Sequence, residues 1–561
     1  MKKIKNIVAV FAIVPALLLS SCSKEYLDRT PTTALDSDLV LNNTDMIPST
    51  VVGTMRMMYS AGFGGRTATV IGDIMTDLIT SVRGSNGSYK DIEEWNINQS
   101  TPDVESIYAA CFQIAATAAR TVEAANRKLS GDTSAMTSAQ KNNLRNAIAA
   151  SLTIKAYVEY FATQYFCVDV NVDNSEYPYL LNDGANYQLP GRTDRKVGIM
   201  ILDGKPLSLT DPANIYTLDY TYKFLEKEIQ EAIDQYNASG SKSFNLAGEA
   251  RYYPTLCAAY MIQSRIYLAQ HKYKEADEAA QNALANLPGS ANPTLISTKD
   301  GLLAAYGATL SSEDVWSLNY TSQDNLSANS LQNLFSSYGF SPSSYATGLF
   351  KATDIRKFLY YDETKSLPSD VKSYCLKYPN QNAVFNVPLL RVPEIYLVQA
   401  EARAGLGDDQ GAKEALFMVL GTRDTAVDDV DAMASKYPMK DQKELMQAIL
   451  DENAREFLCE GHRWFDLRRN GKRLTRNGSI ENGGNNYPTH FKDFPLSTFA
   501  FPIPYGETST EQWKKGRGIY DDGRKDSENW QNNAWDDRQG DNFAPTVTIP
   551  VEGEEYTNQP N

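Results

Sequence analysis

The sequence is poor in the residues that most metal sites and relay-type active sites require. It has 3 His among 561 residues, too few for us to expect a multi-histidine metal site or a histidine-based catalytic relay. Its 6 Cys are scattered and include no CxxC pair, which argues against a zinc site and a disulfide framework. We predict no metal ion and no cofactor. We expect five cysteines to fill core positions as small apolar side chains, namely Cys111, Cys167, Cys257, Cys375 and Cys459.

Positive charge is also in short supply. The chain has 54 Lys and Arg against 69 Asp and Glu, a formal charge of −15 at pH 7. Binding to nucleic-acid phosphates needs clustered basic residues, so no nucleic-acid partner is expected. Nor does a polybasic stretch mark a membrane-surface patch. Tyrosine, by contrast, is abundant at 33 residues and supplies rigid amphipathic surface as well as core packing.

The first 21 residues have the form of a secretory leader. A basic segment with Lys2, Lys3 and Lys5 precedes an apolar run, 7–19, that is short for a bilayer span. The tetrad Leu19-Ser20-Ser21-Cys22 looks like a bacterial lipobox, in which Cys22 becomes the acylated first residue. We therefore predict a lipoprotein signal peptide over 1–21, lipidation of Cys22, and an exported chain tethered to a membrane by acyl chains.

Helical periodicity dominates the rest of the chain. Apolar residues recur at steps of three and four over 144–161 and 225–236, and two further helices are expected at 104–127 and 442–459. Two helical hairpins of tetratricopeptide size are predicted, one over 252–289 and one over 392–420. In the second, Pro393 suits a first helical turn and Gly405 a helix end. The fold class is therefore mainly α.

Strand signals are few. Alternation in CVDVNVD, residues 167–173, favours a short strand. Asp169, Asn171 and Asp173 are also spaced as in a calcium loop, but the glycine and distal glutamate of that pattern are missing. The helices are separated by irregular stretches whose many aromatics and few charge runs favour ordered surface loops. These stretches are chiefly 62–103, 168–215, 310–350, 362–386 and 470–561.

The densest polar cluster is ILDENAREFLCEGHRWFDLRRNG, residues 449–471. Glu452, Glu456 and Glu460 are spaced so that they share one side of a helix, and several arginines stand close by. A glycosidase would need two carboxyl groups facing each other across a substrate, one of them neutral. Carboxylates in line on one helix among arginines are instead expected to form ion pairs that clamp the helix to the loops that follow it.

The same segment carries a family resemblance. ENAREFLCEGHRWFDLRRNG resembles the ERxxELxxEGxRxxDLRR signature of the SusD/RagB family of Bacteroidetes outer-membrane lipoproteins. Other matches follow the family's order: YLDRTP after Cys22, Asp354-Ile355-Arg356, the helix RVPEIYLVQAEARAGLG, and FPIP at 501–504. The resemblance runs from residue 22 to about residue 510. Residues 513–561 depart from the family's usual ending, so no role is assigned to them.

The resemblance implies tetratricopeptide-like helix pairs that support a loop-rich region. It divides the chain into an N-terminal region, 22–240, and a C-terminal region, 241–561. It also implies a surface lipoprotein of the cell outer membrane that captures an oligosaccharide and delivers it to a SusC-like TonB-dependent transporter. It implies no catalysis.

Two loop segments have the composition that glycan capture needs, aromatic faces for sugar rings edged by polar groups for hydroxyls. The first, 77–96, contains Asp77, Arg83, Asn86, Tyr89 and Trp95, and the second, 316–340, contains Tyr320, Asn325 and Tyr338. For each aromatic, core packing is about as good an interpretation as ligand contact.

Two classes of function remain open at this point. The first is a non-catalytic binding protein for oligosaccharides, with peptide capture as its variant. The second is a surface glycoside hydrolase that uses two of the clustered acids.

Overall fold

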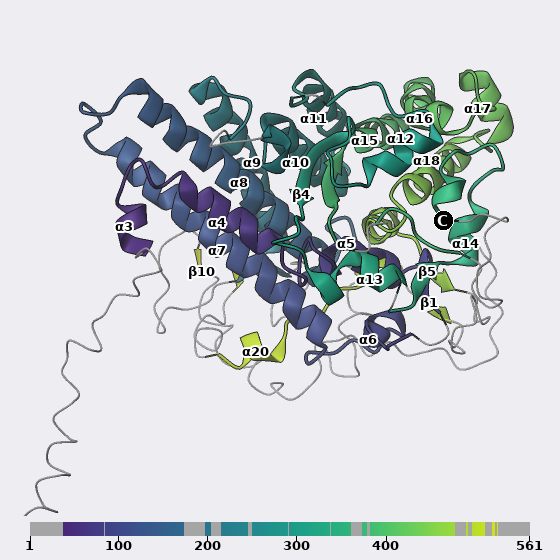
Figure 1. Cartoon of the computed structure of the whole chain (residues 1–561), viewed down its shortest axis with the longest axis horizontal. Coiled ribbons are helices and arrows are strands. Elements are labelled where there is room, and N and C mark those ends of the chain that lie inside the picture. Colours follow the sequence, from purple (N-terminus) through teal and green to yellow (C-terminus); the bar gives the residue numbers. More distant parts are fainter. Residues whose placement is uncertain are drawn as a thin grey trace, which may run out of the picture.

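The structure is a computed structural model (Figure 1). It describes residues 37–82, 85–172, 197–202, 215–244, 249–289, 291–336, 338–360, 373–378, 382–476, 490–491, 496–510, 519–521 and 524–525. The predicted signal peptide, the predicted lipidation site Cys22 and the candidate ligand residue Arg83 lie outside the described residues.

The predicted helix 144–161 is the middle of α8 (Ser138–Phe166), the most buried of three long helices at one end of the molecule (Figure 1). Thr137 and Gln140 form a capping box at its start. From residue 147 to residue 166 every residue is buried, because α4 (Ser49–Met58), α7 (Pro102–Ser130) and α9 (Leu218–Ser239) pack against α8. The apolar stripe in the sequence thus marks only one side of a helix that is covered all round.

Both predicted hairpins are present. Helix α10 (Leu256–Ala269) packs on α11 (Tyr273–Ala285), α15 (Val392–Gly405) packs on α16 (Asp409–Arg423), and α11 packs on α15. Gly405 sits where the hairpins meet, and a Cβ at this position would lie 2.5 Å from Cε2 of Tyr273. Since any side chain here would push the hairpins apart, the glycine serves close packing as well as helix termination.

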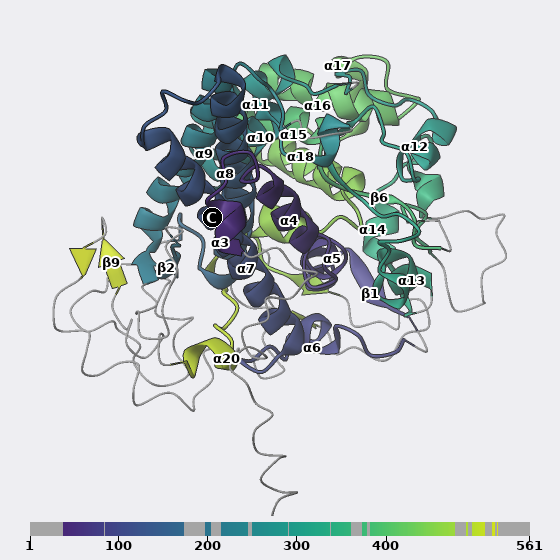
Figure 2. The same ribbon diagram turned by 60° about the vertical axis from the view of Figure 1, so that its left-hand side comes forward.

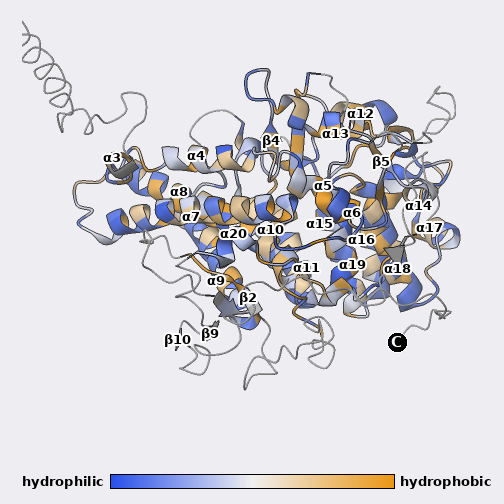
Figure 3. Ribbon diagram, turned by 90° about the horizontal axis from the view of Figure 1, so that it is seen from below, coloured by the Kyte–Doolittle hydropathy of each residue, from blue (hydrophilic) through white to orange (hydrophobic). Residues whose placement is uncertain are grey.

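Helix α5 (Thr67–Ile74) is buried along its whole length in the middle of the molecule (Figure 3). It contacts α7 and α19 (Arg463–Arg469), and α19 in turn contacts α18 (Gln442–Glu456). Shorter helices complete the fold: α3 (Ser37–Leu41), α6 (Lys90–Glu93), α12 (Lys299–Ala305), α13 (Leu331–Ser336), α14 (Ser344–Gly348), α17 (Val430–Lys436) and α20 (Tyr505–Thr508). Single 3-10 turns lie at Ala250–Tyr252, Ser327–Asn329, Lys357–Leu359 and Leu496–Thr498. The described part of the chain is therefore mainly α, as predicted.

Within the described residues, the strands form four small sheets, and the β4–β6 pair among them is buried against the helices. Strand β1 (Ile79–Ser81) pairs antiparallel with β5 (Phe340–Pro342), β4 (Asp314–Asn319) with β6 (Asn386–Arg391), and β7 (Thr475–Arg476) with β8 (His490–Phe491). A fourth sheet has the order β10 (Arg524–Lys525), β9 (Ile519–Asp521), β3 (Ile215–Thr217), β2 (Val197–Met200). Strand β9 runs parallel to β3, so residues 513–561, to which the sequence assigns no role, contribute β9 and β10 to this sheet.

The strand predicted at 167–173 is wrong. Within the described residues 167–172, the chain leaves α8 and turns, because Oδ1 of Asp169 accepts hydrogen bonds from the backbone N–H (2.9 Å) and the side-chain amide (3.0 Å) of Asn171. An aspartate that bonds the backbone two residues ahead makes a turn and competes with strand pairing. The backbone N–H of Asp169 instead reaches the carbonyl oxygen of Ser497 at 2.7 Å.

The five described cysteines are buried thiols without disulfide partners, as predicted for core positions. In the part of the chain that the structure describes, no group of three or more His, Cys, Asp and Glu side chains is arranged to hold a metal ion. Among the helices of that same part, none combines the length and apolar character needed to cross a bilayer.

Candidate functional site

The two predicted ligand segments meet through the β1–β5 pair, although about 240 residues separate them in the sequence. Beyond the strand register, the N–H of Val82 donates to the carbonyl of Gly339 at 2.7 Å, and the N–H of Asn86 donates to that of Tyr338 at 3.4 Å. Gly339 has φ 79°, and a Cβ there would lie 3.0 Å from Cα of Ser85. The left-handed backbone and this close approach both suit glycine. Figure 2 shows β1 next to α13 and α14 in this region.

Three of the predicted aromatic contacts are core side chains. Tyr89, Trp95 and Tyr320 are only 3%, 7% and 2% exposed. The hydroxyl of Tyr89 shares a hydrogen bond with Thr67 (2.8 Å), Nε1 of Trp95 donates to the Met75 carbonyl (2.8 Å), and the hydroxyl of Tyr320 donates to the Tyr59 carbonyl (2.8 Å). These rings hold the loops onto the helical body and offer little surface to a ligand.

Asp77 lies at the opposite end of the β1–β5 pair from Asn86. Its carboxylate accepts two hydrogen bonds from Arg463, from Nε and Nη2, each at 2.9 Å. Nη2 of Arg463 also donates to the hydroxyl of Tyr345 at 3.1 Å. Asp77 is thus a partner in an internal ion pair, and the pair fixes a tyrosine whose side chain is 44% exposed.

The remaining candidates keep part of their surface in solvent. Asn86 is exposed, and Asn325 and Tyr338 are half-buried. Oδ1 of Asn86 accepts from the N–H of Ser88 at 3.0 Å, and Asn325 bonds its own turn through Ser322 and Ser327. Among the described residues, neither the Asn86 amide nitrogen nor the Tyr338 hydroxyl has a hydrogen-bond partner.

Sequence reasoning missed Tyr345, which follows two serines at the start of α14 and precedes no recognisable motif. Tyr345 is recognisable as a candidate only from its exposure on α14 and its contact with the Asp77–Arg463 ion pair, and the fold is needed to show both. We call the side chains of Asn86, Asn325, Tyr338 and Tyr345 the β1–β5 surface.

The glutamates of the signature segment form a buried cluster with basic residues, which we call the central ion-pair network. Glu456 is at its centre, and its carboxylate accepts from Arg391 at 2.7 Å, Arg356 at 3.0 Å and Arg423 at 3.1 Å. Burial alone would raise the pKa of the Glu456 carboxyl, but the guanidinium groups of Arg423, Arg391 and Arg356 hold it well below its usual range. The carboxylate is therefore ionised.

The neighbouring glutamates are held in the same way. Glu452 accepts from Arg356 at 2.7 Å and Arg455 at 2.8 Å, and Glu460 accepts from Arg391 at 2.8 Å and from Lys377. The predicted ion pairs are confirmed, with one correction. Most partners come from segments that precede α18, not from the loops that follow it.

Asp73 joins α5 to the turn before α19. Its two carboxyl oxygens accept from the N–H of Gly461 at 3.0 Å and of Arg463 at 3.2 Å. Burial raises the pKa of Asp73 to about 7, against the opposing effect of these donors. Gly461 has φ 79°, and a Cβ there would lie 2.5 Å from the carbonyl oxygen of Thr69, so α5 and this turn are in close backbone contact.

Comparison with known proteins places this fold. The family model described as the SusD family matches residues 327–546. A SusD superfamily protein of Bacteroides thetaiotaomicron VPI-5482 has a similar solved structure, with 17% identity, 84% of this chain and 99% of that chain covered, and a TM-score of 0.66. The solved structure of a putative sugar binding protein of Bacteroides vulgatus ATCC 8482 is also similar. It is 21% identical, the match covers 84% of this chain and 97% of that chain, and the TM-score is 0.66. Residues 327–546 thus resemble the SusD family, and the two solved structures show that this chain has the same fold.

A curated relative matches over a shorter region. SusD-like protein P38 of Formosa agariphila is 32% identical over 95 residues, which cover 17% of this chain and 19% of that protein. The match therefore spans about a fifth of the relative's length.

Proposed function

We propose that this protein is a non-catalytic lipoprotein of the cell surface that captures oligosaccharides at the β1–β5 surface. The observation that carries the proposal is the meeting of two distant loop segments around partly exposed tyrosine rings and unpaired amide and hydroxyl groups. Sugars are recognised by aromatic faces together with polar groups that bond their hydroxyls. Solved structures of the same fold that are described as a putative sugar binding protein and a SusD-like carbohydrate binding protein, both from Bacteroides vulgatus ATCC 8482, support it.

The contact residues in this proposal are those whose side chains reach solvent. Tyr338 and Tyr345 supply ring faces, while Asn86 and Asn325 supply amide groups at the rim. Tyr89, Trp95 and Tyr320 support the loops from below, and Asp77 holds Tyr345 through Arg463. Arg83 lies outside the described residues and stays a candidate from the sequence alone.

Binding without turnover is the activity that the clustered glutamates favour. A glycosidase acid must stay protonated near neutral pH, whereas Glu456 is ionised between three guanidinium groups. All three glutamates are at most 9% exposed, so a polysaccharide chain has no access to them. Their role in the proposal is to hold α18 in the fold.

We further infer that Cys22 anchors the chain by acylation and that the chain delivers its ligand to a SusC-like TonB-dependent transporter in the outer membrane. The lipobox-like tetrad supports the anchor, and the match of residues 327–546 to the SusD family model supports the transporter partner. In a Bacteroidetes host that lacks the transporter gene, Cys22→Ala should move the protein from the membrane fraction to the soluble fraction. Retention in the membranes of that host would overturn the anchor.

Affinity gel electrophoresis against a panel of polysaccharides tests the ligand class. We expect retardation by at least one polysaccharide, and loss of most of this retardation in Tyr338→Ala. Tyr505→Ala is the matched control, because Tyr505 is 55% exposed but lies on α20. If no polysaccharide retards the wild type and a peptide library binds instead, peptide capture replaces the glycan proposal. Release of sugar products by the wild type, abolished in Glu456→Gln, would favour the hydrolase.

A further inference from the structure

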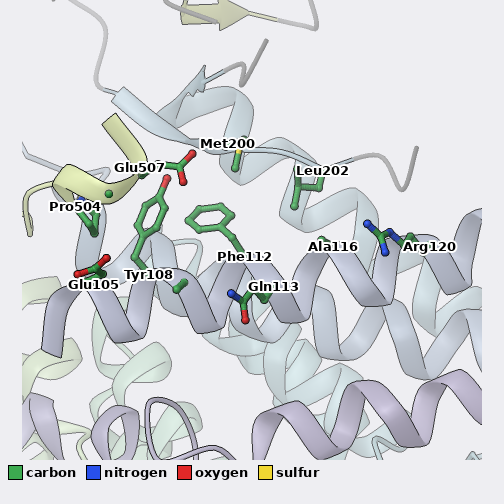
Figure 4. Close-up of a pocket in the computed structure, with 12 residues that line it drawn as sticks. Glu105, Tyr108, Phe112, Gln113, Ala116, Arg120, Met200, Leu202, Pro504 and Glu507 are labelled. Carbon is green, nitrogen blue, oxygen red and sulfur yellow. The ribbon is translucent and has the colours of Figure 1, made fainter. Parts of the chain in front are cut away.

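A cavity of about 420 Å³ lies apart from the β1–β5 surface, between α7, the end of β2 and α20 (Figure 4). One wall is apolar, with Phe112 from α7 facing Met200 and Leu202. The other end carries two carboxylates, Glu105 and Glu507. None of the lining side chains belongs to the β1–β5 surface or to the central ion-pair network.

The polar groups at the acidic end have no partners. Tyr108 is only 6% exposed, and its hydroxyl points toward the carboxylate of Glu507 (Figure 4). Among the described residues, no side chain or backbone group forms a hydrogen bond with the Tyr108 hydroxyl, and no cation pairs with Glu507. Burial raises the pKa of the Glu507 carboxyl. The Tyr108 hydroxyl and the half-buried Glu507 carboxylate therefore keep hydrogen-bonding capacity that a ligand with donors can use.

The two carboxylates lie at opposite ends of the Tyr108 side chain, Glu507 beside its hydroxyl and the exposed Glu105 beside its base (Figure 4). A Cβ built on Gly506 would lie 2.9 Å from Oε1 of Glu105, so the Glu105 carboxylate sits against the residue next to Glu507. The two negative charges make this end of the cavity favourable for a cation that can donate hydrogen bonds.

We propose that this cavity binds a primary ammonium group carried on an apolar stem. The ammonium group donates to Glu507 and the Tyr108 hydroxyl, Glu105 adds negative charge at the same end, and the stem lies along Phe112, Met200 and Leu202. A sugar ring fits the cavity less well, because stacking requires an open aromatic face and Tyr108 and Phe112 are only 6% and 8% exposed. A free alkylamine and a lysine side chain share the required chemistry.

Calorimetric titration of the purified full chain tests the proposal without any mutation. We expect n-pentylammonium to bind about tenfold or more tightly than n-pentanol, which has the same stem but no charge. If Nα-acetyl-lysine amide binds comparably, the site takes lysine side chains. If n-pentylammonium alone binds, the site takes free amines. Equal affinity for n-pentanol, or no binding of either ammonium compound, would overturn the proposal.

Variants then locate the binding. Glu507→Gln and Tyr108→Phe preserve side-chain shape and should each weaken n-pentylammonium binding, the first about tenfold. Glu123→Gln is the matched control, because Glu123 also lies on α7 but pairs with Arg127 outside the cavity. Near-ultraviolet circular dichroism checks that each variant keeps its tertiary packing. Unchanged affinity in both folded cavity variants would place the ammonium group elsewhere and refute the assignment.

Discussion

In the central ion-pair network each glutamate lies between two or more basic groups and has almost no contact with water. At the β1–β5 surface, Asn86 and Tyr338 keep donor groups without partners among the described residues. Both regions are rich in polar side chains, and both are assembled from distant parts of the sequence. The difference is that the first region has already used its hydrogen-bonding capacity inside the fold, while the second retains it. Mutations should therefore separate the two regions by their effects on stability and on binding.

Glu456→Gln should have the largest effect on stability. It leaves Arg356, Arg391 and Arg423 buried with one charge fewer among their partners, and breaking a buried pair costs about 3–5 kcal/mol. Urea denaturation should show a loss of this order. The control is Glu278→Gln, which removes an exposed contact with Lys274 at 3.9 Å and should change stability by less than about 0.5 kcal/mol. Similar losses of unfolding free energy in Glu456→Gln and Glu278→Gln would contradict a special contribution of the central ion-pair network to stability.

Trp95→Ala comes next. Trp95 packs against Phe499, with ring centroids 4.9 Å apart, and against Trp464 at 6.3 Å, so its removal leaves a cavity under the loop that carries Asn86. We expect a loss of about 3 kcal/mol in the free energy of unfolding, measured by thermal and urea denaturation. Loss of polysaccharide retardation without any loss of stability would instead make Trp95 a ligand contact.

Asp73 gives a smaller, pH-dependent effect. Its pKa is about 7 in the folded chain against 3.8 for an unperturbed carboxyl, so between these values the folded state holds a proton that the unfolded state has lost. Stability must then fall as the pH rises through about 7. Between pH 5 and 7, the wild type should lose about 2 kcal/mol more than Asp73→Asn. The buried Asp314, whose pKa is also raised to about 7, contributes equally to both proteins. Parallel pH profiles would contradict the assignment to Asp73.

Tyr338→Ala should change stability least. Its side chain is half-buried and its hydroxyl bonds no described residue, so we expect a loss of less than about 1 kcal/mol. The same variant should lose most of the binding to whichever polysaccharide retards the wild type. A large loss of stability together with the loss of binding would show that Tyr338 is a packing residue like Tyr89.

The long helices could be predicted from the sequence because their apolar residues recur with helical period, as α8 and the two hairpins show. The prediction of irregular surface loops was wrong for α5, which lies in 62–103, because a short helix that is buried on every side has no polar face to give it a helical period.

The strand prediction at 167–173 was wrong because the same alternating residues can form a strand or a turn. Asp169 accepts a hydrogen bond from the backbone two residues ahead, and this bond stabilises the turn. The spacing of Glu452, Glu456 and Glu460 was enough to predict that these glutamates form ion pairs. It could not identify the basic partners, because most of them come from distant segments that only the fold brings together.

The candidate site was predictable as two segments and less so as single residues. Tyr89 and Tyr338 lie in loops of similar composition, yet one ring is buried and the other reaches solvent. That outcome is set by tertiary contacts such as the approach of Tyr89 to Phe340, with ring centroids 6.2 Å apart. No local pattern records such a contact.

The bond between Asp77 and Arg463 has a consequence for binding. It joins the start of the first ligand segment to α19, across 386 residues of sequence, and the same guanidinium restrains Tyr345. A loop that is already ordered by the body of the protein loses little conformational entropy when a ligand arrives. The proposed surface is in this sense preorganised at one end, and the free energy of each sugar contact made there goes into affinity instead of ordering the loop.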